Sequence, residues 1–235
     1  EAEQALRDAL KIEPQNSIFT LNMSAFLAAA GRHDQAIEWV DAAIDLDPKY
    51  IDAHLKKASL LIQQGRLEEG LSLYESRWQN PHWHSLPARI KAPRWNGEDL
   101  SGKHLITWNE QGFGDAIMYA RYITILADQA ETLTIMCEPT LHDLFRRNLP
   151  ASIKIIGLND LPPPADYHVS MMSVPHHFGV TFDNLKTEGP YLTPNKVAGQ
   201  KWRETFTLKQ LQVGLICAGN PRQSHDYSRS LATKI

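Results

Sequence analysis

Two patterns of apolar and polar positions follow each other along the chain. Residues 1–13, 17–48 and 51–79 place apolar side chains at helical spacing and contain few runs of β-branched residues, which predicts helices paired as hairpins. From residue 104 onward, short runs of β-forming residues alternate with helical patterns. Such alternation is typical of a parallel sheet whose strands are connected by helices. The patterns therefore predict an α + α/β chain.

A repeat of 34 residues runs through the helical part. Gly31 and Gly65 are 34 positions apart, and so are Pro14 and Pro48. Glycine between two helices and proline after the second one resemble the tetratricopeptide repeat, whose period is also 34 residues. Since such repeats usually serve as scaffolds, their concave face is a candidate surface for a protein partner.

The second part opens with a buried strand at 104–108, a glycine-containing turn at 109–114 and a helix at 115–130. Strand, turn and helix in this order are typical of the first βα unit of a parallel sheet. Further strands are expected at 132–137, 153–156, 166–173 and 211–217, and further helices at 139–149 and 196–206. These elements predict a Rossmann-like, mainly parallel sheet.

The turn has several possible roles. Gly112 and Gly114 match the first two glycines of the dinucleotide fingerprint, but Ile117 takes the place of the third,. Glu138 ends the second strand, where a ribose-binding acid would lie. Asp115, at the start of the helix, would repel a pyrophosphate; it could instead cap the helix or act as a base. A dinucleotide-binding protein therefore remains an alternative.

Composition and charge narrow the class of protein. The 235 residues carry a net charge of -3, which argues against non-specific binding to nucleic acid. Apolar runs are far shorter than the roughly 20 residues of a membrane span. Cys137 and Cys217 form no CxxC motif, which excludes a cysteine zinc site and favours a reducing, cytoplasmic location,. His82 and His84 have no third ligand nearby, so no metal is expected.

Two blocks of sequence resemble a known arrangement. Glu110-Gln111-Gly112-Phe113-Gly114-Asp115 forms the first block, and Ala218-Gly219-Asn220-Pro221 the second, followed by Asp226 and Arg229-Ser230. Together with the repeats, they resemble bacterial tetratricopeptide proteins fused to a glycosyltransferase-like domain. That domain is similar to the heptosyltransferases and, more distantly, to O-GlcNAc transferase, which share the two-domain GT-B fold.

The resemblance implies transfer of a sugar from a nucleotide sugar to a hydroxyl of a protein or glycan acceptor, without a metal or other cofactor. It implies that Asp115 is the base, and Glu110 in the same turn could do the same work. The residues expected to contact substrate or donor are Gln111, Gly112, Gly114, Gly219, Asn220, His225, Arg229 and Ser230.

The resemblance also divides the chain. The expected parts are repeats at 1–80, a linker at 81–103, a Rossmann-like domain at 104–207 and the start of a second, donor-binding domain at 208–235. A complete second domain needs on the order of 100 more residues. We therefore expect a piece of a longer protein that lacks most of the donor site. The rival hypothesis is a protein-interaction scaffold whose transferase domain is degenerate.

Overall fold

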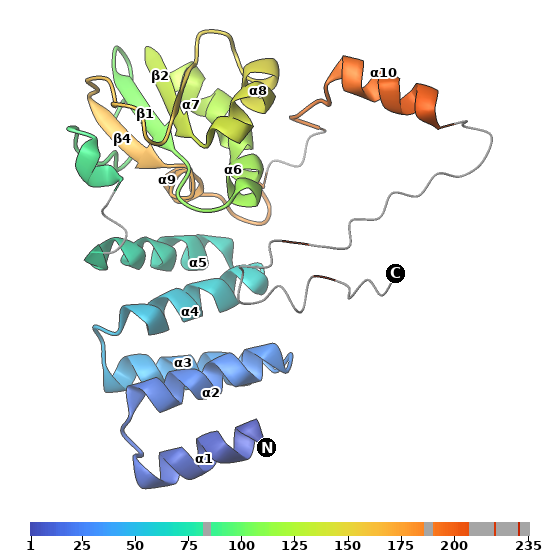
Figure 1. Cartoon of the computed structure of the whole chain (residues 1–235). Helices are drawn as coiled ribbons and strands as arrows, with labels where there is room; N and C mark the ends of the chain where they lie inside the picture. The colour runs from blue at the N-terminus through green and yellow to red at the C-terminus, as the bar shows by residue number, and fades with distance from the viewer. Residues whose placement is uncertain (82–85, 186–189, 207–218, 220–229, 231–235) are drawn as a thin grey trace. The chain divides into compact units, whose positions relative to one another are not determined.

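The structure is a computed structural model that describes residues 1–81, 86–185, 190–206, 219 and 230. Contacts within the chain form two compact units, residues 1–192 and 193–235. The first unit contains a stack of helices and a sheet (Figure 1). The second contains α10 (Lys196–Thr205). The predicted strand at 211–217 lies outside the described residues.

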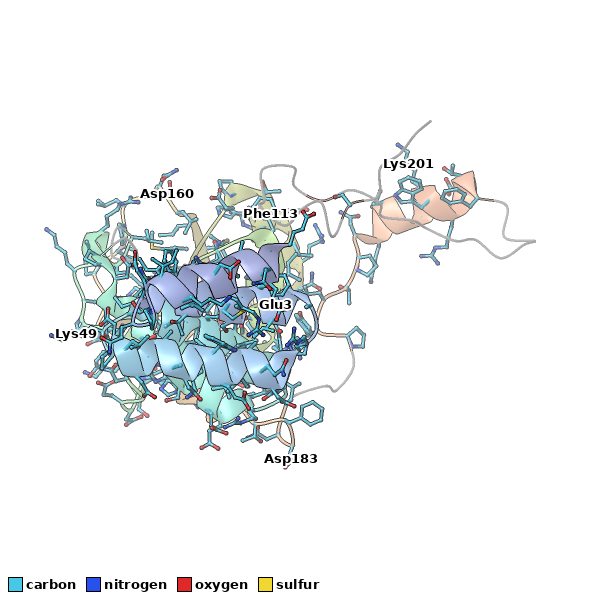
Figure 2. The ribbon with its side chains drawn as sticks, turned by 90° about the horizontal axis from the view of Figure 1, so that it is seen from below. Glu3, Lys49, Phe113, Asp160, Asp183 and Lys201 are labelled. Atoms are coloured by element: carbon cyan, nitrogen blue, oxygen red, sulfur yellow. The ribbon has the colours of Figure 1, made fainter. Side chains whose placement is uncertain are left out.

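Helical hairpins make up the first part of the larger unit, as predicted (Figure 1). The helices are α1 (Ala2–Ile12), α2 (Ser17–Ala29), α3 (His33–Leu46), α4 (Ile51–Gln63) and α5 (Leu67–Tyr74), followed by the 3-10 turn η1 (Glu75–Gln79). Neighbouring helices pack on each other in chain order. Glu3, labelled in Figure 2, joins α1 to the next hairpin through an ion pair with Arg32 at 3.0 Å.

The repeat period determines where the hairpins turn and how closely they pack. Gly31 and Gly65 follow α2 and α4 with φ of +75° and +79°, a left-handed conformation that glycine adopts at little cost. Ala36 and Ala43 of α3 are fully buried, and their small size lets helices approach each other. Gly70 takes the place of Ala36 one repeat later, against α4.

Within the described residues, the sheet is parallel and has four strands in the order β3-β2-β1-β4. Their bounds are β1 (His104–Trp108), β2 (Thr132–Cys137), β3 (Lys154–Gly157) and β4 (Tyr167–Ser170). Leu105 of β1 pairs with Leu133 of β2 and with Tyr167 of β4. The parallel sheet with intervening helices confirms the predicted α + α/β fold.

Helices cover one face of this sheet. They are α6 (Phe113–Tyr119), α7 (Ile123–Gln129), α8 (Pro139–Asn148) and the short α9 (Val174–His177), with the 3-10 turn η4 (Ala120–Tyr122) between α6 and α7. The helix expected at 115–130 is thus interrupted. Its side chains Ile123 and Leu126 pack with Leu105 and Ile135 in one core.

The opposite face of the sheet is covered differently. Ile106, Trp108 and Met136 pack there against Trp78 of η1 and Ile90. No helix lies in residues 158–166, all of which are described, between β3 and β4. The cover comes instead from the segment that leads from the helices into the sheet, which includes the 3-10 turn η3 (Pro87–Arg89). Part of the expected linker is therefore packed structure.

Arg77 joins the helical part to the sheet. Its fully buried guanidinium donates through Nε and Nη2 to the two carboxylate oxygens of Glu110, at 2.7 and 2.9 Å. Nη2 also donates to Ser173 Oγ at 2.7 Å. Nη1 donates to the carbonyl of Tyr74 at 3.1 Å and to Glu75 Oε1 at 2.6 Å. These five bonds match the five N–H donors of arginine.

Hydroxyl groups complete the Arg77 network. Ser170, at the end of β4, donates to Glu110 Oε2 at 2.5 Å. Ser173 accepts from Arg77 and donates to the Glu75 carboxylate at 2.9 Å. Burial alone would raise the pKa of Glu75, but the charge and hydrogen bonds of Arg77, with the bond from Ser173, hold that pKa below its usual value. The last helical turn and both strand ends are therefore held together by charge-assisted bonds.

Replacing Gly70 by alanine tests the close packing of α4 and α5. A Cβ at this position would lie 2.7 Å from Ile62 Cγ1 and 3.0 Å from the carbonyl of Ala58. We expect Gly70→Ala to lower the free energy of unfolding by about 1–3 kcal/mol, measured by urea denaturation. In the control Gly114→Ala, the new Cβ meets nothing within 4 Å. Because alanine favours the helix more than glycine does, this variant should raise the free energy of unfolding by up to about 1 kcal/mol. Equal effects would contradict the packing argument.

Removing Arg77 tests the network. Arg77→Met leaves the Glu110 carboxylate buried without its counter-charge, so we expect a loss of about 3–5 kcal/mol in the free energy of unfolding. Adding Glu110→Leu should recover part of that loss, since the buried Glu110 charge is then removed as well and only Glu75 still lacks its counter-charge,. The control Arg66→Met breaks the exposed pair with Glu69 and should cost about 0–1 kcal/mol. Additive losses in the double variant would show that Arg77 and Glu110 are not coupled.

Candidate functional site

The carboxyl ends of β1 and β4 form the natural place for a site. The chain runs from β1 to β2 and β3 on one side, then returns to place β4 on the other side of β1. In open α/β sheets, ligands bind outside the strand ends at such a reversal. The predicted turn at 109–114 follows β1, and residues 171–173 follow β4. The Arg77 network lies between them.

Glu110 is fully engaged in that network. Its side chain is 2% exposed, and its oxygens accept bonds from Arg77 and Ser170. A carboxylate held this way keeps its turn in place relative to the helices. The structure thus gives Glu110 a positioning role, and no oxygen of it is left without a protein partner.

Asp115 has a different environment. It is half-buried in the first turn of α6, and its Oδ2 accepts a bond from the backbone N–H of Gly112 at 3.0 Å. This bond satisfies one of the free donors at the helix start, so the capping role anticipated for Asp115 is present. Within the described residues, Oδ1 has no hydrogen-bond partner. The carboxylate is therefore oriented by one oxygen and available through the other.

Two amide side chains hold the rest of the turn. Asn109 is buried; its Nδ2 donates to the Gln111 carbonyl at 2.9 Å, and its Oδ1 accepts from the N–H of Glu138 at 3.2 Å. Gln111 donates to the hydroxyl of Tyr74 on α5 at 2.7 Å. The turn is thereby bonded both to the end of β2 and to the last helical hairpin. Gly112 and Gly114 are exposed beside it.

Two tyrosines stand near these carboxylates. Burial raises the pKa of Tyr119 to about 12, and the negative charge of Asp115 adds to the effect. Burial and the charge of Glu110 likewise raise the pKa of Tyr74. Both hydroxyls are therefore protonated at neutral pH. A hydroxyl that keeps its proton can donate a hydrogen bond to an oxygen atom of a ligand.

The remaining predicted residues belong to the second unit. Gly219 donates its backbone N–H to Ser230 Oγ at 2.8 Å, so the structure brings these two together. Asn220, His225 and Arg229 lie outside the described residues. Among the residues that are described, no cluster of His, Cys, Asp and Glu could hold a metal ion. No described helix is long and apolar enough to cross a membrane.

Sequence reasoning missed Tyr74, Arg77 and Asn109. Asn109 stands in the predicted turn, so its position directly after a buried strand was a usable signal. Arg77 and Tyr74 come from a separate helical part, and their pattern is that of any helix end. Their roles depend on contacts with residues more than 30 positions away.

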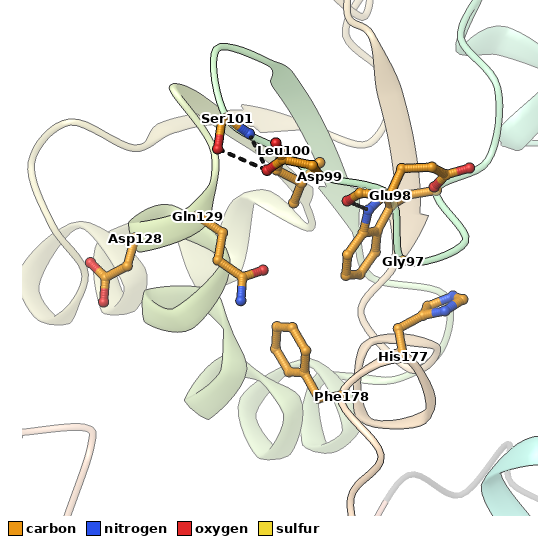
Figure 3. Close-up of a pocket in the computed structure, with 10 residues that line it drawn as sticks. Gly97, Glu98, Asp99, Leu100, Ser101, Asp128, Gln129, His177 and Phe178 are labelled. Carbon is orange, nitrogen blue, oxygen red and sulfur yellow. Dashed lines mark hydrogen bonds between the residues drawn. The ribbon is translucent and has the colours of Figure 1, made fainter.

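A concave region lies beside α7 and α9, away from the Asp115 turn. This pocket has a volume of about 520 Å³, and Trp95, Phe178 and His177 line it with several acids (Figure 3). Of these acids, Glu98 accepts a bond from the N–H of Asn96 at 2.6 Å, while Asp99 accepts from the N–H and hydroxyl of Ser101. These two carboxylates therefore stabilise the turns in which they lie.

The helical part matches a known family. Two sequence profiles, both described as tetratricopeptide repeat, match residues 1–51 and 27–90. Protein FlbA of Caulobacter vibrioides is 36% identical over 98 residues, which is 40% of this chain and 16% of that protein. Small glutamine-rich tetratricopeptide repeat-containing protein 2 of Saccharomyces cerevisiae is 31% identical over 68 residues, which is 29% of this chain and 20% of that protein. The chain thus spans a fifth or less of the length of these relatives.

Solved structures also resemble parts of the chain. The Yersinia enterocolitica type III secretion chaperone SycD, in complex with a peptide of the translocator YopD, is 27% identical with a TM-score of 0.33, over 37% of this chain and 70% of that one. A Thermobaculum terrenum O-GlcNAc transferase mutant is 15% identical with a TM-score of 0.33, over 66% of this chain and 37% of that one. Because both TM-scores are low, neither likeness defines the fold of the whole chain. The profile matches show that residues 1–90 contain tetratricopeptide repeats, which form scaffolds for protein interaction.

Proposed function

We propose that this chain is the acceptor-binding part of a sugar-transferring protein. In this proposal the repeats bind a protein acceptor or partner, and Asp115 is the base that takes the proton from the acceptor hydroxyl. The observation that carries it is the Asp115 carboxylate, held by one oxygen at the start of α6 while the other has no partner among the described residues. It lies at the strand ends where open α/β sheets bind ligands.

The environment of Asp115 suits proton transfer. A general base must stand within hydrogen-bond reach of the hydroxyl and keep a fixed orientation. The bond from Gly112 fixes the orientation of the carboxylate. Tyr119, which keeps its proton at neutral pH, can donate a bond to a neighbouring oxygen of the acceptor. We assign no chemical role to Glu110, because Arg77 and Ser170 occupy its oxygens.

The repeats would contribute by placing the acceptor. The turn that precedes Asp115 is bonded to the last hairpin through Gln111 and Tyr74, and through Glu110 and Arg77. A partner held by the repeats would therefore be presented to the base in a fixed geometry. Holding two reactants in place in this way lowers the entropic part of the barrier.

The donor in this proposal is a nucleotide sugar, used in the cytoplasm. Its diphosphate would be met by the segment at 219–230, where Arg229 and His225 supply positive charge. Asn220 and Ser230 belong to the same segment.

A scaffold without transferase activity is the second candidate. Two observations favour it: the Glu110 carboxylate is enclosed in the Arg77 network, and Asp115 already serves as a helix cap. In that case the sheet would act as a rigid end-piece for the repeats. The repeats alone would then carry the function, through binding of a protein.

The substitution Asp115→Asn separates the two candidates. Asparagine still accepts the bond from Gly112, so the melting temperature should change little. It cannot take a proton, so sugar transfer should fall by about 10²–10⁴-fold. Transfer is measured on the complete protein with nucleotide sugars labelled in the sugar and with proteins bound by the repeats as acceptors.

The control is Asp128→Asn, at the other end of the same helical segment, where the same charge is removed from an exposed side chain. It should leave transfer unchanged. A near-normal rate in Asp115→Asn would exclude Asp115 as the base. No transfer from any donor, with partner binding intact, would favour the scaffold.

A further inference from the structure

A pocket opens on the sheet face that lacks helices. It has a volume of about 470 Å³ and is lined by Trp78, Pro87, Ala88, Arg94 and His168. This size falls within the range of small-molecule sites. Of these residues, Trp78 comes from η1, His168 from β4 and the other three from the segment that enters the sheet. The pocket shares no lining residue with the Asp115 turn.

Local backbone pairing turns Arg94 into this pocket. Residues 93–95 run alongside β4: His168 N–H donates to the Pro93 carbonyl at 3.0 Å, and Trp95 N–H donates to the His168 carbonyl at 2.8 Å. Paired residues of neighbouring strands share a face, and successive residues alternate. Arg94 therefore lies with its bridge partner His168 on the pocket face, while Trp95 lines the pocket of Figure 3 on the other face.

Arg94 carries a positive charge that the described residues do not neutralise. No carboxylate among them lies within ion-pair distance of it, and its guanidinium lies over the ring of Trp78, with 5.2 Å from the guanidinium carbon to the ring centre. Arg77 contacts the same ring at 4.4 Å, but Glu75 and Glu110 balance its charge. The guanidinium donors of Arg94 are thus available to a ligand.

His168 adds a second donor. Burial and the charge of Arg94 lower its pKa to about 4, so the ring is neutral at pH 7. Its Nδ1 accepts a bond from Trp108 Nε1 at 3.4 Å. A neutral imidazole that accepts at one nitrogen carries its proton on the other. Nε2–H of His168 is therefore a donor, with no hydrogen-bond partner among the described residues.

We propose that this pocket binds a small organic anion, a carboxylate or phosphate attached to a ring-shaped or apolar body. Arg94 is its counter-ion, and His168 donates a second bond to the same group. Trp78, Pro87 and Ala88 supply the apolar walls against which the body packs. This proposal does not depend on sugar transfer, and a separate binding experiment tests it.

Binding of simple aromatic anions to the full chain tests this site. The probes are benzoate and phenyl phosphate, with neutral benzamide and inorganic phosphate as comparisons, followed by isothermal titration and by Trp fluorescence. At least one aromatic anion should bind more than tenfold tighter than benzamide, and inorganic phosphate should bind more weakly than phenyl phosphate. The ratio of benzoate to phenyl phosphate binding separates a carboxylate site from a phosphate site.

Variants locate the binding. Arg94→Gln should weaken it roughly 10- to 100-fold, the effect of losing charge-assisted bonds, without lowering the melting temperature. Arg146→Gln removes the same charge from an exposed position on α8 and should have no effect. Ala88→Trp should block the pocket. No binding at millimolar concentrations, equal binding of benzamide, or unchanged binding in Arg94→Gln would overturn the proposal.

Discussion

One buried arginine determines how the two parts of this molecule meet. The Arg77 guanidinium is removed from water completely, which is costly for a charged group unless every donor is bonded. Glu110, Glu75, Ser173 and a carbonyl supply those bonds. Since the partners come from the helical part and from the end of the sheet, the bonds can form together in one arrangement only. The last repeat and the strand ends are therefore fixed to each other.

The same network separates two acids that look alike in the sequence. Glu110 and Asp115 are five positions apart in one glycine-containing segment, yet the first is enclosed by Arg77 and the second is held by a single backbone N–H. The geometry of the strand-end turn thus depends on Glu110, while Asp115 keeps one carboxylate oxygen without a partner among the described residues, as the proposed base requires. The role of a carboxylate here is set by what surrounds it.

Local sequence patterns were sufficient to predict most of the fold. The 34-residue period placed the hairpins, and the order of strand, turn and helix placed the parallel sheet, because both signals are contained in short stretches of chain. Local patterns did not predict the break at η4 or the bond between Arg77 and Glu110. No proline or glycine marks the break at η4 (Ala120–Tyr122), and the bond joins residues 33 positions apart. At the candidate site, the sequence predicted the turn at 109–114, but it did not predict that Glu110 is enclosed while Asp115 keeps one oxygen without a partner among the described residues.

The uneven covering of the sheet bears on how such proteins exchange parts in evolution. One face is covered by helices that belong to the sheet's own connections, while the other is covered by Trp78 and Ile90 from the approach to it. A gene fusion that cut the chain at residue 103 would deliver a sheet with one bare apolar face. Any transfer of the α/β part to a new repeat array must therefore carry the end of the last repeat with it, including Arg77.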